Sequence, residues 1–108
     1  MGSGIKMINE TIEQIKKATD YQINKKILKE KVISDLHIVH NEGLFLITIE
    51  LLSYLSISTD VELILEDTYG NPIKVDRVKL LEDARQLYKS TTEMWLTEHD
   101  KLRRIRII

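Results

Sequence analysis

Three histidines are the residues of this chain best suited to binding a metal. His37 and His40 lie three positions apart, a spacing that brings two imidazoles together on a helix but sets them on opposite faces of a strand. Apolar residues around them alternate with a period of two, which predicts a strand. His99 lies far along the chain between Glu98 and Asp100. We therefore expect no metal site.

A second group with chemical potential consists of carboxylates near a predicted hairpin. Two carboxylates with tuned pKa values can act as general acid and base, but aspartate is also common at turns and at the ends of strands as a cap. The chain has no glycine-rich phosphate loop, serine-nucleophile motif or dinucleotide fingerprint. We expect a protein that is not an enzyme and has no cofactor or small-molecule substrate. The carboxylates concerned are Asp60, Glu62, Glu66, Asp67 and Asp76.

Charge is sorted along the chain into three blocks. Residues 1–31 carry a net charge of +3, residues 32–83 carry −7 and residues 84–108 carry +3. Such blocks either dock onto one another within one fold or present faces of opposite sign to partners. The chain has no cysteine, which excludes disulfides and thiol chemistry and is compatible with a reducing compartment. We predict a cytoplasmic protein.

The length of 108 residues fits one domain. Residues 1–6 resemble a remnant of a cloning vector, which makes Met7 the expected native start and residues 7–108 a single α+β domain. The longest apolar run, residues 44–57, is too short to cross a bilayer and contains Glu50. No membrane association is expected.

The apolar pattern predicts an α+β fold with an N-terminal helix, an antiparallel sheet of two hairpins, and a long or broken C-terminal helix packed on the sheet. In the first helix, residues 9–29, isoleucines at helical spacing mark one face and lysines the outer face. Residues 32–40 and 44–51 are expected to form the first hairpin, around a turn at residues 41–43 in which Gly43 is free to take a positive φ. The isoleucines are Ile8, Ile12, Ile15, Ile23 and Ile27.

The middle of the chain leaves one ambiguity. Residues 53–60 suit either a strand that continues past a bulge or a loop with buried anchors. Residues 61–66 and 73–75 then predict a second hairpin around a turn at residues 67–72.

The final helical region runs from Arg77 to Arg104 and is expected to be capped by Asp76. An unbroken helix of that length would be roughly 40 Å long and would project from a compact domain with a radius of gyration near ~13 Å. Ser90–Glu93 has the form of a capping box and could instead start a second helix. Because the apolar stripe keeps its phase through this segment, an unbroken helix is favoured.

The expected function follows from apolar surface that so short a chain has difficulty covering. Leu44 and Leu46 lie on the second face of a strand, and the chain ends in isoleucines interleaved with arginines. We predict a non-enzymatic interaction or assembly protein that forms a homo-oligomer or a stable complex with a protein partner through its C-terminal helix and tail. The predicted interface residues are Leu44, Leu46, Tyr88, Trp95, Leu102, Ile105, Ile107 and Ile108.

The alternative function is that of a nucleic-acid-binding accessory protein. Basic residues of the first helix and the tail would then contact phosphates, although the chain as a whole is not basic and has few aromatic residues for base stacking. Phosphate-driven binding weakens steeply with salt, which separates this alternative from apolar assembly. The predicted contacts are Lys16, Lys17, Lys25, Lys26, Lys29, Arg103, Arg104 and Arg106.

Overall fold

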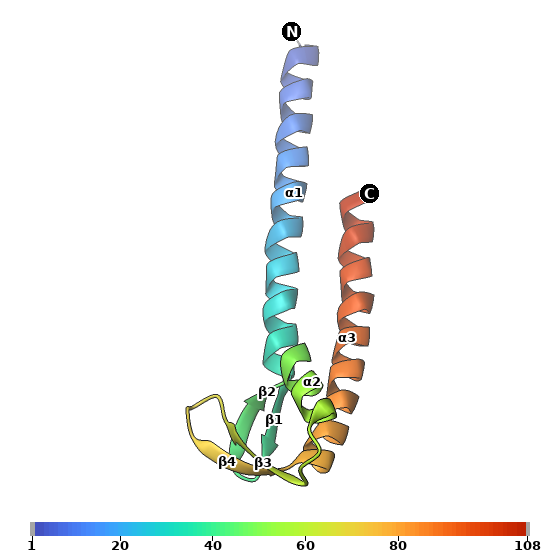
Figure 1. Ribbon diagram of the computed structural model, residues 1–108. Helices are drawn as coiled ribbons and strands as arrows, with labels where there is room; N and C mark the ends of the chain where they lie inside the picture. The colour runs from blue at the N-terminus through green and yellow to red at the C-terminus, as the bar shows by residue number, and fades with distance from the viewer. Residues whose placement is uncertain (1, 108) are drawn as a thin grey trace.

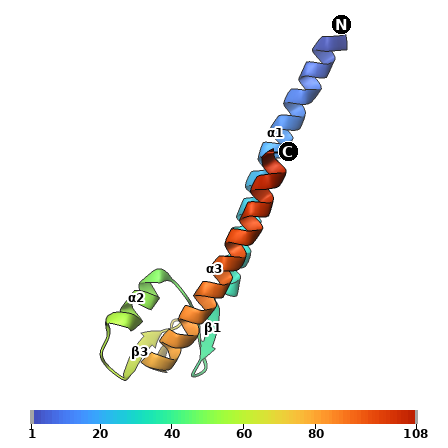
Figure 2. The same cartoon turned by 90° about the vertical axis from the view of Figure 1, so that its right-hand side faces the viewer.

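The computed structural model describes residues 2–107, with side chains described for residues 10–104. The molecule is elongated, measuring 75 × 24 × 19 Å with a radius of gyration of 21.2 Å. Two long helices, α1 (Gly2–Asp35) and α3 (Arg77–Ile107), run antiparallel side by side and form a stalk (Figures 1 and 2). The shorter elements form a base at one end, and at the other end α1 extends past the end of α3.

Helix α1 continues beyond its predicted end at residue 29 and takes in Val32, which was wrongly predicted to begin the first strand. Leu28, Val32 and Leu36 are spaced four residues apart and all are buried, so one side of the last turns packs into the base. The Leu36 amide donates to the carbonyls of Val32 and Ile33 at 3.1 and 3.2 Å, which closes the helix.

The first hairpin consists of β1 (His37–His40) and β2 (Gly43–Leu46), with His40 opposite Gly43. Its two-residue loop has positive φ angles at Asn41 (49°) and Glu42 (69°), the combination found in a type I′ turn. The positive φ angles thus fall on Asn41 and Glu42, and Gly43 does not use the freedom that the sequence offered it. Gly43 instead lies in β2, where a Cβ would come within 2.7 Å of Cγ1 of Ile73.

Helix α2 (Ile49–Ile57) replaces two predicted features. The second strand does not extend to residue 51, and of residues 53–60, for which a strand or a loop was proposed, 53–57 are helical and 58–60 form a loop. Thr48 begins the helix because its hydroxyl accepts the Leu51 amide at 3.1 Å. Leu55 is fully buried beneath the helix.

The second hairpin pairs β3 (Glu62–Glu66) with β4 (Pro72–Asp76), and Gly70 takes a φ of 80° in the intervening turn. The α+β class and both hairpins are confirmed. The two hairpins are not joined into the one antiparallel sheet that was predicted, because each forms its own two-stranded antiparallel sheet.

Helix α3 starts directly after β4, and Asp76 caps it as predicted by accepting the Lys79 amide at 3.2 Å. The helix is continuous through Ser90–Glu93, which confirms the unbroken alternative. Within the described part of the chain, no helix carries an apolar stretch that would let it cross a bilayer. The core lies in the base and consists of Leu28, Val32, Leu36, Phe45, Ile47, Leu55, Leu63, Val75, Leu80 and Ala84.

Candidate interaction surface

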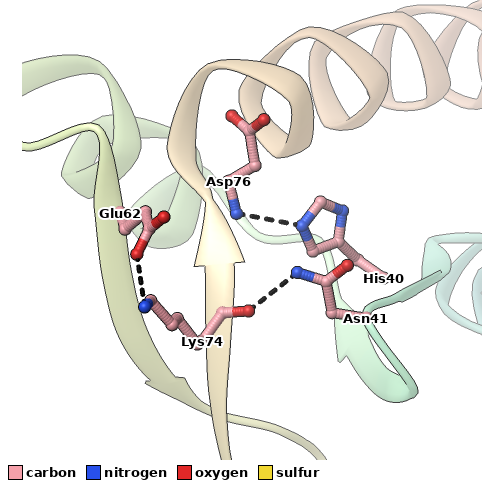
Figure 3. A network of polar contacts seen from close by, with 5 residues as sticks. All are labelled: His40, Asn41, Glu62, Lys74 and Asp76. Atoms are coloured by element: carbon pink, nitrogen blue, oxygen red, sulfur yellow. Dashed lines mark hydrogen bonds and ion pairs between the residues drawn. The ribbon is translucent and has the colours of Figure 1, made fainter.

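The three histidines each contact a different part of the fold. His40 Nε2 accepts the Asp76 amide at 3.1 Å and joins the first hairpin to β4 (Figure 3). His37 Nδ1 lies 3.0 Å from the Ser34 carbonyl oxygen, and His99 Nε2 lies 3.3 Å from the Tyr21 hydroxyl. Among the residues with described placement, no three or more histidine, aspartate or glutamate side chains gather as they would around a metal ion.

Asp67 connects the two hairpins. One carboxylate oxygen accepts the amides of Tyr69 and Asn71 at 3.0 and 2.9 Å, and the other accepts the Leu44 amide of β2 at 3.3 Å. The backbone hydrogen bond from Asn71, aided by those from Leu44 and Tyr69, holds the pKa of Asp67 below its usual value. The chemistry of this buried carboxylate is therefore that of a structural acceptor.

Two other predicted carboxylates, Glu62 and Asp76, lie opposite each other on β3 and β4 and line a hollow of about 230 Å³. Glu62 is bound to Lys74 Nζ at 2.7 Å, and this contact raises the pKa of Lys74. Asn41 Nδ2 donates to the Lys74 carbonyl at 2.8 Å in the same network (Figure 3). With Glu62 paired and Asp76 capping α3, both carboxylates have structural partners.

The predicted oligomer interface is partly covered by the chain itself. Leu46, Tyr88, Trp95 and Leu102 are partly buried and pack against the core cluster. Leu44 is half-buried in β2, where its amide and carbonyl contact the second hairpin. The side chains of Ile105, Ile107 and Ile108 lie outside the described residues, so their predicted role stays a prediction.

Between the two long helices, Lys29 of the predicted nucleic-acid contacts lies against Trp95 of the predicted oligomer interface. The ammonium of Lys29 lies 4.3 Å from the ring centroid of Trp95, and Lys25 lies 5.7 Å from the Tyr21 ring. These two lysines of α1 therefore contact aromatic rings of their own chain.

The remaining predicted nucleic-acid contacts do not share one face. Lys16, Lys17 and Lys26 are exposed, and at 3.6 residues per turn they point in different directions around α1. Arg103 is paired with Asp100 at 3.3 Å, Arg104 is exposed, and the side chain of Arg106 is outside the described residues.

An exposed row of isoleucines on α1 was not among the predicted interface residues. We call Ile12, Ile15, Ile23 and Ile27 the isoleucine stripe; their side chains are 57%, 62%, 50% and 57% exposed. These residues were expected to mark the apolar face of the first helix, and that face is not the one that α3 covers. Exposed apolar residues that occur singly are ordinary, whereas a row at helical spacing suits an interface.

Helix geometry explains why the stripe is uncovered. Leu28 and Val32 are buried, and Tyr21, seven residues before Leu28, contacts His99 of α3. With a rotation of roughly 100° per residue, Ile12 and Ile23 lie about 140–180° around the helix from Leu28 and Val32. Helix α1 thus has one face against α3 and the base and an apolar face directed away from α3.

A separate apolar hollow of about 250 Å³ lies along α3 and is lined by Thr92, Trp95, Leu96 and His99. All four residues come from one helix, so among the residues whose side chains are described no second element contributes polar groups that converge on a ligand. No protein-family model, curated protein or solved structure matches this chain.

Proposed function

We propose that this protein is a non-enzymatic assembly module that forms a homo-oligomer or a stable complex with a protein partner through its helical stalk. The observation that carries the proposal is the isoleucine stripe, which is half or more exposed at every member. The sequence favoured the C-terminal helix and tail as the contact surface. Because Tyr88, Trp95 and Leu102 already pack on the chain's own core, we assign the principal contact to α1.

The free energy available from the stripe is comparable with the cost of association. Full burial of an isoleucine side chain contributes about 1.5–3 kcal/mol, so the exposed half of each stripe residue corresponds to about 1 kcal/mol. Two copies that buried their stripes against each other would gain on the order of 8 kcal/mol from these eight side chains, against an association cost of about 4–15 kcal/mol. Contacts beside the stripe would therefore decide the affinity.

The proposal is tested by the mass of the native protein and of the double variant Ile15→Ser/Ile23→Ser. Serine has nearly the same helix propensity as isoleucine, so α1 is retained. In a dimer formed through the stripe, the variant removes about 4 kcal/mol of apolar burial, which corresponds to roughly a 1,000-fold weaker Kd. Multi-angle light scattering and sedimentation over a concentration series measure the mass and the Kd of each protein.

A matched control is Leu96→Ser, which removes a side chain of similar exposure (63%) from α3 outside the stripe. We expect this variant to associate as the native protein does. A native protein that stays monomeric at every concentration, and that copurifies with no partner dependent on Ile15 and Ile23, would refute the proposal.

A further inference from the structure

We infer that the occupant of the isoleucine stripe is a second copy of this chain, with the two α1 helices antiparallel. This inference rests on the proposed function and adds to it the identity and direction of the partner. The four residues of the stripe are nearly symmetric about the midpoint between Thr19 and Asp20, because Ile12 and Ile27 are equally distant from it and Ile15 and Ile23 lie close to equal distances; Ile33, 43% exposed on the same side of α1, lies beyond this symmetric set. An antiparallel two-fold pair therefore sets Ile12 level with Ile27 of the other copy, and Ile15 close to the level of Ile23.

Charges on the same side of α1 argue against the parallel arrangement. Glu30 lies seven residues after Ile23 and so shares its side of the helix, while Lys26 lies between the stripe residues; both are exposed. A parallel pair in register would bring each Glu30 against the other Glu30 and each Lys26 against the other Lys26. Like charges in such a contact are unfavourable, and apolar surroundings strengthen the repulsion.

The antiparallel arrangement removes both conflicts and adds attraction. The two Glu30 side chains move to opposite ends of the contact, roughly 30 Å apart at 1.5 Å per residue. Lys16 and Asp20 lie on the same flank of the stripe, and both are exposed. In an antiparallel pair, identical flanks meet, so Lys16 of each copy comes within about one helical turn of Asp20 of the other, and the two Asp20 side chains come level with each other at the midpoint. Each Asp20 then has Lys16 of its own copy and Lys16 of the other copy within about one turn, which offsets the contact between the two aspartates.

Disulfide trapping tests the direction, and the absence of native cysteine makes single-cysteine variants unambiguous. Ile12→Cys and Ile27→Cys are prepared separately, one with a small tag that changes its mass, and are mixed under mild oxidation. We expect the mixed disulfide between the two variants to dominate on a non-reducing gel, and each variant alone to cross-link poorly. Asn24→Cys is the control, because Asn24 is exposed on α1 but points away from the stripe.

The outcomes separate this inference from the proposed function. Strong cross-linking of Ile12→Cys to itself and of Ile27→Cys to itself, without a mixed product, would show a parallel pair and overturn the inference alone. Cross-linking no greater than that of Asn24→Cys, in a protein that still self-associates, would also overturn the inference alone. A monomeric native protein would overturn the inference, and it would remove the homo-oligomer from the proposed function. Far-UV circular dichroism of each variant establishes that the helices are intact.

Discussion

The contact between the two hairpins depends on a missing side chain at Gly43, and we predict that Gly43→Ala destabilises the fold. The Cβ of alanine would lie 2.7 Å from Cγ1 and 3.2 Å from Cδ1 of Ile73, and 3.0 Å from Cε2 of Phe45. Carbon atoms in ordinary contact are about 3.5–4.0 Å apart, so either Ile73 or the whole of β2 must move.

The magnitude follows from two opposing effects. Overfilling a packed site costs about 1–3 kcal/mol. Replacing glycine by alanine within a strand recovers about 0.5–1 kcal/mol, because the unfolded chain loses freedom. We expect the free energy of unfolding to fall by about 0–2.5 kcal/mol, with Tm falling by roughly 4–8 °C per kcal/mol for a domain near this size.

A double-mutant cycle with Ile73→Ala isolates the contact between the hairpins, since this change removes Cγ1 and Cδ1 of Ile73 and leaves only the contact with Phe45 of the same strand. Urea unfolding followed by circular dichroism gives the four free energies of unfolding. We expect the loss in the double variant to be smaller than the sum of the losses in the two single variants by about 1 kcal/mol or more. Ile64→Ala, an exposed position on β3, is the control and should add to Gly43→Ala within about 0.5 kcal/mol.

Simple additivity of Gly43→Ala and Ile73→Ala would refute the reasoning, because the two sites would then not be in contact. A rise in stability on Gly43→Ala would refute it more directly. It would mean that the hairpins have room for the methyl group.

Two further predictions concern charge. The pKa of Asp67 is held below its ordinary 3.8, so its stabilising contribution is complete above that pH and is lost as the pH falls through the lower folded-state pKa. Asp67→Asn should therefore lower the urea midpoint at neutral pH, and its difference from the native protein should shrink below pH 3.8; a difference that does not vary with pH would contradict this. Because the exposed lysines of α1 are spread around the helix, labelled DNA should show no saturable binding by fluorescence anisotropy at about 150 mM salt. A salt-sensitive complex weakened by Lys16→Glu/Lys17→Glu would favour the nucleic-acid alternative.

Local signals in the sequence were sufficient for much of the fold. The turn at Asp67–Pro72 predicted the second hairpin, and Asp76 before an apolar stripe predicted the cap and start of α3. Both features depend on hydrogen bonds between residues near one another in sequence, so pattern alone identifies them.

Helix α2 was missed because its apolar residues also fit a strand. Ile47, Ile49 and Leu51 alternate as one face of a strand would, while Leu51, Leu52 and Leu55 have helical spacing. A short apolar segment is ambiguous by periodicity. The decisive residue was Thr48, whose hydroxyl caps the helix.

The sequence marked an apolar face on the first helix but could not reveal which side the rest of the chain would cover. The buried residues Leu28 and Val32 are outnumbered by the isoleucines, but they lie next to the base. The direction in which α3 leaves β4 determines which face of α1 is covered by α3. That choice depends on residues more than forty positions apart. The isoleucine stripe consequently became apparent only from the tertiary structure.

The hydrogen bonds around Leu44 also bear on how the molecule avoids fibril formation. Residues 44–49 combine apolar, β-branched and aromatic side chains without a charge, the composition of segments that stack into cross-β fibrils. On the outer edge of β2, the Leu44 amide is bound to Asp67 and its carbonyl accepts the Thr68 amide at 2.8 Å. A strand from another molecule would have to break these bonds before it could add to that edge. Loosening the Asp67 turn would therefore be expected to promote amyloid-like aggregation before global unfolding.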